Sequence, residues 1–192
     1  QNLVKAMFND EKFSKTINMS GVNSINWARI IAQAVYYFYA YFKVGNGQPL
    51  SFCVPTGNFG DIYAGYLAKK LGLPINKLIV ATNKNDILQR VINTGEYKPD
   101  TVKPTITPSM DIQVASNFER LLYYILDEND IRVGALMNAL SSKSLFKLEK
   151  KEIGEIKKDF AAVKITDEET VSIIDKIYKE YKFIIDPHTP QG

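Results

Sequence analysis

The chain has 192 residues, of which 45% are hydrophobic and 23% are charged, and its net charge is +3; these values exclude a disordered chain and give no argument for a nucleic-acid partner. The single cysteine, Cys53, excludes an internal disulfide, and with only one histidine the usual Cys/His zinc site cannot form. No apolar run approaches the roughly 20 residues that span a bilayer, and no signal peptide is recognisable. We therefore expect a globular cytoplasmic domain without metal or membrane partner.

Two helices are predicted before the first strand. Residues 1–19 form a polar helical segment that ends at Ser20-Gly21. A longer, aromatic-rich helix is predicted from Asn26 to about Val44, with Ser24 as its N-cap. Its apolar residues recur at three and four positions, which predicts a core-facing stripe made of Trp27, Ile30, Ile31, Ala34, Val35, Phe38, Tyr41 and Phe42.

Residues 50–70, LSFCVPTGNFGDIYAGYLAKK, carry the strongest functional signal. Leu50–Val54 has the length and residue types of a buried strand, Pro55 ends it, and a helix opens at Asp61 after a glycine-bracketed turn. A strand, a glycine loop and a helix N-terminus in this order suit a phosphate dianion, because the first amides are unpaired and the helix dipole favours negative charge. An ordinary strand-to-helix turn fits the glycine spacing equally well. The spacing matches neither a P-loop nor a dinucleotide fingerprint.

The rest of the chain alternates between strands and helices. A second buried strand is predicted at residues 77–82 and a helix at 86–93. Three prolines make 96–115 irregular, as expected of a long functional or linker loop. Beyond it we expect helices at 117–127, 129–140 and 144–159, a strand at 160–165, and a helix capped by Thr166. The sequence therefore predicts an α/β fold with a parallel sheet, helices on both faces and a helix-rich C-terminal half.

Several ordered motifs resemble one enzyme family. The string T-G-N-F-G-D at 56–61 closely resembles the pyridoxal-phosphate loop of the threonine synthase family, which belongs to the tryptophan-synthase-β-like enzymes of fold type II. Further similar segments are V-N-S-I-N-W-A-R at 22–29, A-T-N-K-N-D at 81–86, S-M-D-I at 109–112, S-N-F-E-R at 116–120 and D-P-H-T at 186–189.

The resemblance implies a lyase of threonine biosynthesis that converts O-phospho-L-homoserine and water to L-threonine and phosphate with pyridoxal 5'-phosphate. It implies that residues 1–45 are a helical segment of the smaller N-terminal part of the parent enzyme. Residues 46–192 would belong to its cofactor-binding α/β domain, with a helical extension. Two other functions stay open from the residues: a doubly wound enzyme for a phosphosugar or nucleotide, and a non-catalytic α/β interaction module.

The resemblance also implies site residues. The cofactor loop would be formed by Gly57, Asn58, Phe59 and Gly60, and the substrate site by Asn23, Ser24, Asn26, Arg29 and Asp111. A guanidinium fork suits both the phosphate and the carboxylate of the substrate. Asn58 could equally hold the turn, and Asp111 could cap a loop or organise the site. The family's Schiff-base lysine lies upstream, in an S-F-K-D-type segment that does not occur here, so we expect no catalytic residue in this chain and no activity from it alone. The family's C-terminal T-A-H-P segment is also missing.

Overall fold

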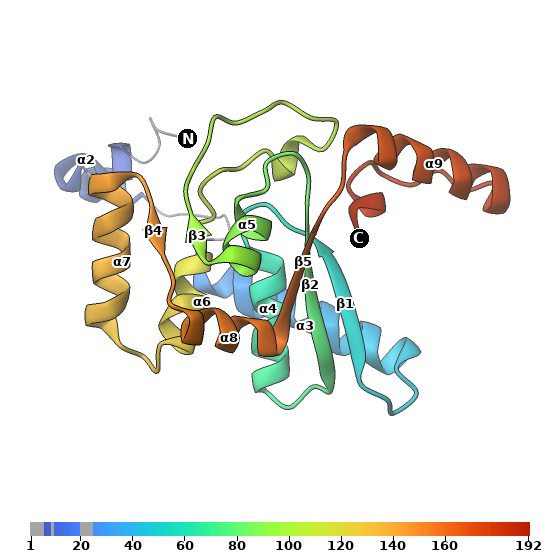
Figure 1. Ribbon diagram of the computed structural model, residues 1–192, viewed down its shortest axis with the longest axis horizontal. Coiled ribbons are helices and arrows are strands. Elements are labelled where there is room, and N and C mark those ends of the chain that lie inside the picture. The colour runs from blue at the N-terminus through green and yellow to red at the C-terminus, as the bar shows by residue number, and fades with distance from the viewer. Residues whose placement is uncertain (1–5, 9, 20–24) are drawn as a thin grey trace.

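The structure is a computed structural model that describes residues 6–8, 10–19 and 25–192. Its strands are β1 (Leu50–Pro55), β2 (Ile75–Thr82), β3 (Glu96–Tyr97), β4 (Phe146–Lys147) and β5 (Phe160–Lys164). The helices are α2 (Glu11–Thr16), α3 (Trp27–Val44), α4 (Gly60–Lys70), α5 (Ile87–Thr94), α6 (Phe118–Ile125), α7 (Asp130–Lys143), α8 (Lys150–Asp159) and α9 (Asp167–Tyr181), with short 3-10 turns η1 (Pro108–Met110) and η2 (Thr189–Gln191). Figure 1 shows the three longer strands side by side, with most helices gathered along one side of them.

The main sheet has the strand order β1-β2-β5, and both pairs are parallel. Phe52 is the partner of Leu78, which in turn is the partner of Phe160. The α/β class, the parallel pairing of the first two strands and the strand at 160–165 are therefore confirmed. β3 and β4 form a separate antiparallel pair that joins the start of the long loop to the segment before α8.

The hydrophobic core lies against one face of this sheet. Alternate residues of a strand point to opposite faces, and those in or against the core are Phe52, Val54, Leu78, Val80, Phe160 and Ala162. Their neighbours Ile79 and Val163 lie outside the core, and Val163 is 42% exposed. We expected helices on both faces, whereas the helices α3 to α8 all contribute to this single core. The strand order gives the reason, because right-handed crossovers that advance in one direction place their helices on the same face.

Helix α3 is oriented differently from the prediction. Its buried residues are Ile30, Ala34 and Tyr37, whereas Val35 and Phe42, which we assigned to the core, are 62% and 77% exposed. The helix is apolar around most of its circumference, so the sequence permits more than one buried stripe. The remaining residues of the predicted stripe divide between the two faces: Phe38 and Tyr41 pack against the core, and Trp27 and Ile31 are exposed.

The partner helix α4 selects the stripe of α3 that is buried. The Tyr37 hydroxyl donates to the Asp61 carbonyl at 3.0 Å. A Cβ added to Gly65 would lie 2.5 Å from the Tyr37 ring, so the missing side chain is what lets the two helices approach. At the N-terminus of α3, the Asn26 side chain accepts from the Ala28 amide at 2.9 Å and caps the helix. Ser24, the predicted cap, lies outside the described residues.

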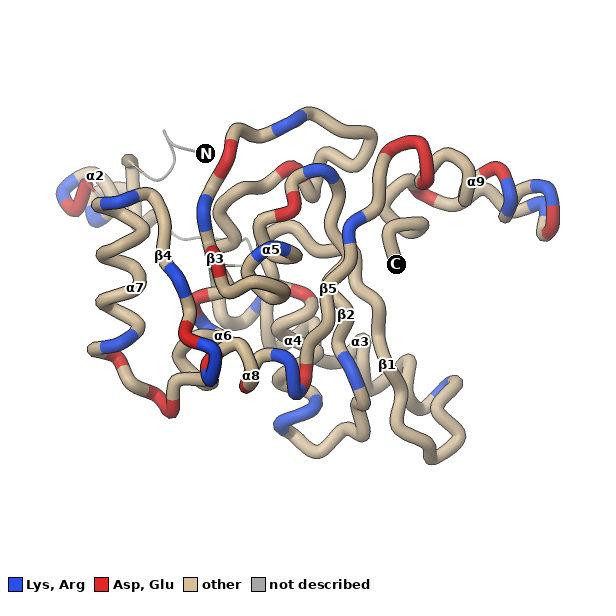
Figure 2. Tube along the Cα trace, in the orientation of Figure 1, with Lys and Arg blue, Asp and Glu red and all other residues tan. Residues whose placement is uncertain are grey.

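The surface carries charges of both signs. Figure 2 shows basic and acidic residues intermixed along α8 and α9, and Thr166 and Glu169 form the predicted capping box at the start of α9. Within the described ranges, no helix combines the length and the apolar character that crossing a membrane requires. The division of the chain at residues 45 and 46 stays a prediction.

Candidate active site

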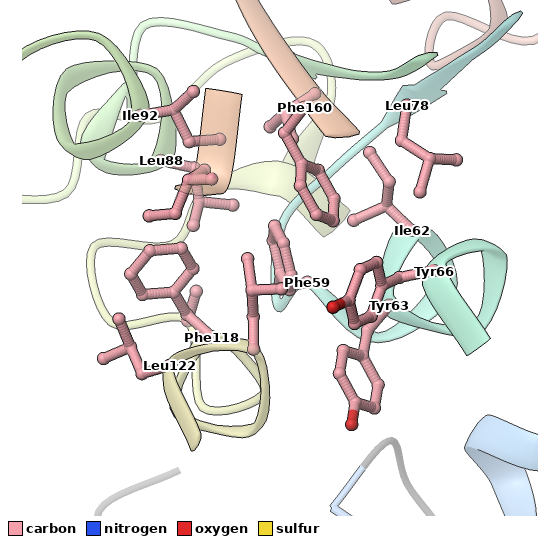
Figure 3. Packing of buried hydrophobic residues seen from close by; sticks show 14 of the residues in the cluster. Phe59, Ile62, Tyr63, Tyr66, Leu78, Leu88, Ile92, Phe118, Leu122 and Phe160 are labelled. Atoms are coloured by element: carbon pink, nitrogen blue, oxygen red, sulfur yellow. The ribbon is translucent and has the colours of Figure 1, made fainter. Parts of the chain in front are cut away.

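The glycine loop leaves the carboxyl end of β1 and is anchored at both ends. At its start, the Thr56 amide donates to the Ala81 carbonyl at 2.8 Å, which ties the loop to β2. At its end, Phe59 occupies the N-cap position of α4 with φ 64° and ψ 10°, in the left-handed region that non-glycine residues rarely adopt. The Phe59 ring is fully buried, and its centre lies 5.3 Å from that of the Phe118 ring and 5.7 Å from that of the Phe160 ring. Figure 3 shows Phe59 packed among the buried side chains of the core, near Phe118 and Phe160. This packing holds the backbone in its strained turn.

The turn leaves backbone donors at the start of α4. In the described part of the chain, the amides of Gly57, Phe59 and Gly60 donate no backbone hydrogen bond, and no side chain caps α4. Uncapped amides at the start of an 11-residue helix form a ready site for an anion, reinforced by the helix dipole. The loop therefore fits the phosphate group for which the sequence predicted it.

Asp61 lies in the first turn of α4, where a carboxylate interacts favourably with the helix dipole, and its side chain does not cap the helix. Burial raises the pKa of its carboxyl group, and the neighbouring Tyr37 hydroxyl partly offsets that rise.

Asn58 holds the neighbouring segment in place. Its side-chain oxygen accepts from the Ser116 amide at 2.7 Å and from the Ser116 hydroxyl at 2.8 Å. Its main-chain carbonyl accepts from the Asn117 side chain at 3.0 Å and from the Asn117 amide at 3.3 Å. Of the two roles left open by the sequence, the structure shows the turn-holding one, and direct contact with a phosphate stays a prediction.

Gly57 makes room for the long loop to return. A Cβ on Gly57 would lie 2.7 Å from the Ser109 carbonyl oxygen and 3.2 Å from the Met110 Cα. Only a residue without a side chain allows this approach. The segment 109–112 therefore closes over the start of the glycine loop, so the loop at 96–115 reaches the candidate site.

Asp111 organises that long loop. One carboxylate oxygen accepts from the Asn83 side chain at 2.8 Å, from the Asn85 side chain at 3.0 Å and from the Thr105 hydroxyl at 2.7 Å. The other oxygen accepts from the Thr105 amide at 3.0 Å. Asn83 and Asn85 are almost fully buried where β2 ends. Both oxygens of Asp111 are thus used inside the protein, and a direct contact between Asp111 and substrate stays a prediction that this geometry does not favour.

The predicted substrate residues before α3 are only partly described. Asn23 and Ser24 lie outside the described residues. The Asn26 side-chain oxygen caps α3, and Arg29 is exposed in the first turns of that helix, where its guanidinium is accessible to a ligand. Their contact with substrate stays a prediction.

A cleft of about 580 Å³ lies beside this segment, and its position was not predicted. It is lined by Ile25, Trp27, Tyr63, Ser116, Glu119, Arg120, Tyr123, Tyr124 and Val133. These residues come from α3, α4, α6 and α7 and from the residues just before α3 and α6. The cleft therefore brings together two of the motifs that carried the family resemblance, those at 22–29 and 116–120. Sequence reasoning identified the S-N-F-E-R motif but assigned no role to Asn117 or Arg120.

Comparisons with known proteins agree on one family. No family model matches the chain. The chain is 46% identical over 209 aligned positions to threonine synthase of Saccharomyces cerevisiae, and 46% identical over 193 to that of Pseudomonas aeruginosa. Each alignment covers the whole chain and 41% of the relative. A crystal structure of PLP-bound threonine synthase from Brucella melitensis superimposes with a TM-score of 0.94 at 48% identity, covering all of this chain and 42% of that one. The chain therefore spans about two fifths of the length of the relatives that it matches.

Proposed function

Along its whole length the chain is homologous to threonine synthases, and from this premise we propose that it forms the part of such an enzyme that holds the cofactor phosphate and the substrate. The proposed reaction converts O-phospho-L-homoserine and water to L-threonine and phosphate. The proposed cofactor, pyridoxal 5'-phosphate, supplies when bound an electron sink for carbanions of the substrate. The Schiff-base lysine for this cofactor would come from another part of the full-length enzyme. The cytoplasmic location expected from the sequence stays a prediction.

The observation that carries the proposal is the set of uncapped amides at the start of α4. Gly57, Phe59 and Gly60 present their amides without a side-chain cap. Because the Phe59 ring is buried in the core, the turn is held before any ligand arrives. A phosphate bound there needs no rearrangement of the loop, which lowers the entropic cost of binding.

The substrate needs a second cationic group. O-phospho-L-homoserine carries a phosphate and a carboxylate, and the glycine loop would already be filled by the phosphate of the cofactor. Arg29 supplies an accessible guanidinium at the start of α3. We assign it, with Asn23, Ser24 and Asn26, to the binding and orientation of the substrate. Asp111 contributes by holding the long loop against Gly57.

The test uses the full-length enzyme and its Gly60→Val variant. The valine side chain crowds the amides that would hold the phosphate, so we expect at least a roughly tenfold weaker affinity for pyridoxal 5'-phosphate, equal to about 1.4 kcal/mol. Affinity for pyridoxal, which lacks the phosphate, should change little. Gly134→Val on α7 is the matched control, because a Cβ there meets nothing within 4 Å.

Two results would contradict the proposal. One is an unchanged preference for pyridoxal 5'-phosphate over pyridoxal in the Gly60→Val variant. The other is a full-length enzyme that, loaded with cofactor, releases neither L-threonine nor phosphate from O-phospho-L-homoserine.

A further inference from the structure

Arg120 connects two segments that the sequence treats as separate motifs. Its Nη2 donates to the Ile25 carbonyl at 2.9 Å, and its Nε donates to the Asn117 side-chain oxygen at 3.0 Å. Its guanidinium also lies 5.6 Å from the centre of the Trp27 ring, within the range of a cation–π interaction. One half-buried side chain thus binds the start of α6 and both sides of the N-cap of α3.

The connection continues to the glycine loop. Asn117 is 1% exposed, and while its side-chain oxygen accepts from Arg120, its side-chain nitrogen donates to the Asn58 carbonyl at 3.0 Å. A continuous set of hydrogen bonds therefore runs from Asn58 through Asn117 and Arg120 to Ile25. Because Asn117 is buried, its amide has few alternative partners, which favours a single arrangement of these groups.

We propose that Arg120 is a positioning residue that fixes the segment around Ile25–Trp27 relative to the glycine loop. The role in substrate binding rests on the proposed function, in which Arg29 and Asn26 face the substrate while the loop holds the cofactor phosphate. The distance between these two anion-binding groups then depends on Arg120, which touches neither ligand. Two acceptors and one aromatic ring define its position, and a planar fork suits them better than the point charge of a lysine.

The predicted consequence is a loss of substrate binding without a loss of cofactor binding. In the full-length enzyme, Arg120→Ala removes the hydrogen bond from Arg120 to the Ile25 carbonyl and the contact of the guanidinium with the Trp27 ring. We expect KM for O-phospho-L-homoserine to rise about 10- to 100-fold, since displacements near 1 Å cost that much in a positioned site. Affinity for pyridoxal 5'-phosphate should change less than twofold. Added guanidinium should partly restore KM in Arg120→Ala. The KM of Arg120→Lys should lie between that of the unmodified enzyme and that of Arg120→Ala.

A second measurement separates positioning from direct contact with the substrate. Hydrogen exchange of peptides covering residues 25–31, followed by mass spectrometry without substrate, should be faster in Arg120→Ala than in the unmodified enzyme. Arg132→Ala is the matched control, because it also removes a guanidinium that makes two hydrogen bonds. In this case both go to the Glu152 carboxylate, at 2.8 and 3.0 Å. It should leave both KM and the exchange of residues 25–31 unchanged.

Each outcome decides the question. A raised KM with faster exchange supports the positioning role. A raised KM with unchanged exchange overturns it and makes Arg120 a direct ligand of the substrate. An unchanged KM in an active enzyme also overturns it. If the unmodified enzyme does not convert O-phospho-L-homoserine, the proposed function fails, whereas faster exchange in Arg120→Ala would still show that Arg120 holds the segment.

Discussion

Replacing Asp111 tests whether one carboxylate holds the long loop over the candidate site. Asp111→Ala removes four accepted hydrogen bonds, from Asn83, Asn85 and, twice, Thr105. Hydrogen bonds to a charged group contribute about 1.5–3 kcal/mol each, but they are not additive here. The Asn83 amide still donates to Thr107 at 2.9 Å, and the Asn85 amide still donates to the Lys103 carbonyl at 2.8 Å.

The expected destabilisation is therefore smaller than the sum of four bonds. We expect the free energy of local opening of the loop to fall by about 2–4 kcal/mol. Asp111→Asn should cost only about 1 kcal/mol. An amide oxygen can keep the three bonds made by one carboxylate oxygen, while its NH₂ group would face the Thr105 amide, which is another donor.

Hydrogen exchange measures this opening directly. In the full-length protein, peptides covering residues 103–112 should exchange roughly 30- to 1,000-fold faster in Asp111→Ala. This range is the expected change in opening free energy converted at about 1.4 kcal/mol per factor of ten. Asp100→Ala is the control on the same loop, because the exposed Asp100 side chain accepts only from the adjacent Thr101 amide among the described residues. Equal exchange rates in the two variants would refute the organising role of Asp111.

Two further predictions concern charged groups. Arg29→Lys keeps the charge but loses the planar fork, so KM for O-phospho-L-homoserine should rise by the equivalent of about 1–3 kcal/mol at unchanged cofactor affinity; full kcat/KM in this variant would return Arg29 to a structural role. Burial of Glu152 opposes its charged form, but the hydrogen bonds from Arg132 and from the Glu149 amide outweigh it and lower the pKa of Glu152. A carboxyl whose pKa is lower in the folded state stabilises the fold above its unfolded pKa, near 4.3, and loses that contribution as the pH falls through the folded value. Glu152→Gln should therefore lower stability at pH 7 and show a smaller further loss on acidification below about pH 4, as measured by thermal unfolding across pH; parallel pH profiles in the two proteins would contradict this.

The sequence predicts most successfully where local rules decide. β1 begins at Leu50, as predicted, and α4 begins one residue before Asp61, because an apolar run, a proline and a glycine pair restrict the backbone without help from distant residues. β2 begins at Ile75 rather than at residue 77. The capping box at Thr166 is confirmed for the same local reason.

It predicts less well where distant partners decide. The face of α3 that is buried depends on Gly65 of α4, which admits the Tyr37 ring. The role of Asp111 depends on Asn83 and Asn85, more than 25 residues earlier in the chain. No periodicity or spacing within α3 or the long loop contains that information. Family motifs mark both regions as special, but they do not say whether a polar side chain faces a ligand or another part of the protein.

The glycine loop shows why a motif can locate a site while its side chains avoid the ligand. Position 57 has no room for a side chain, because the Ser109 carbonyl lies close to it. The Asn58 side chain and carbonyl bind Ser116 and Asn117. The Phe59 ring is buried in the core. The groups left for the phosphate are backbone amides, which every non-proline residue carries. What the string T-G-N-F-G-D specifies is therefore the shape of the turn, and the proposed binding capacity follows from that shape. Substitutions that keep the turn should keep cofactor binding even where they change the motif.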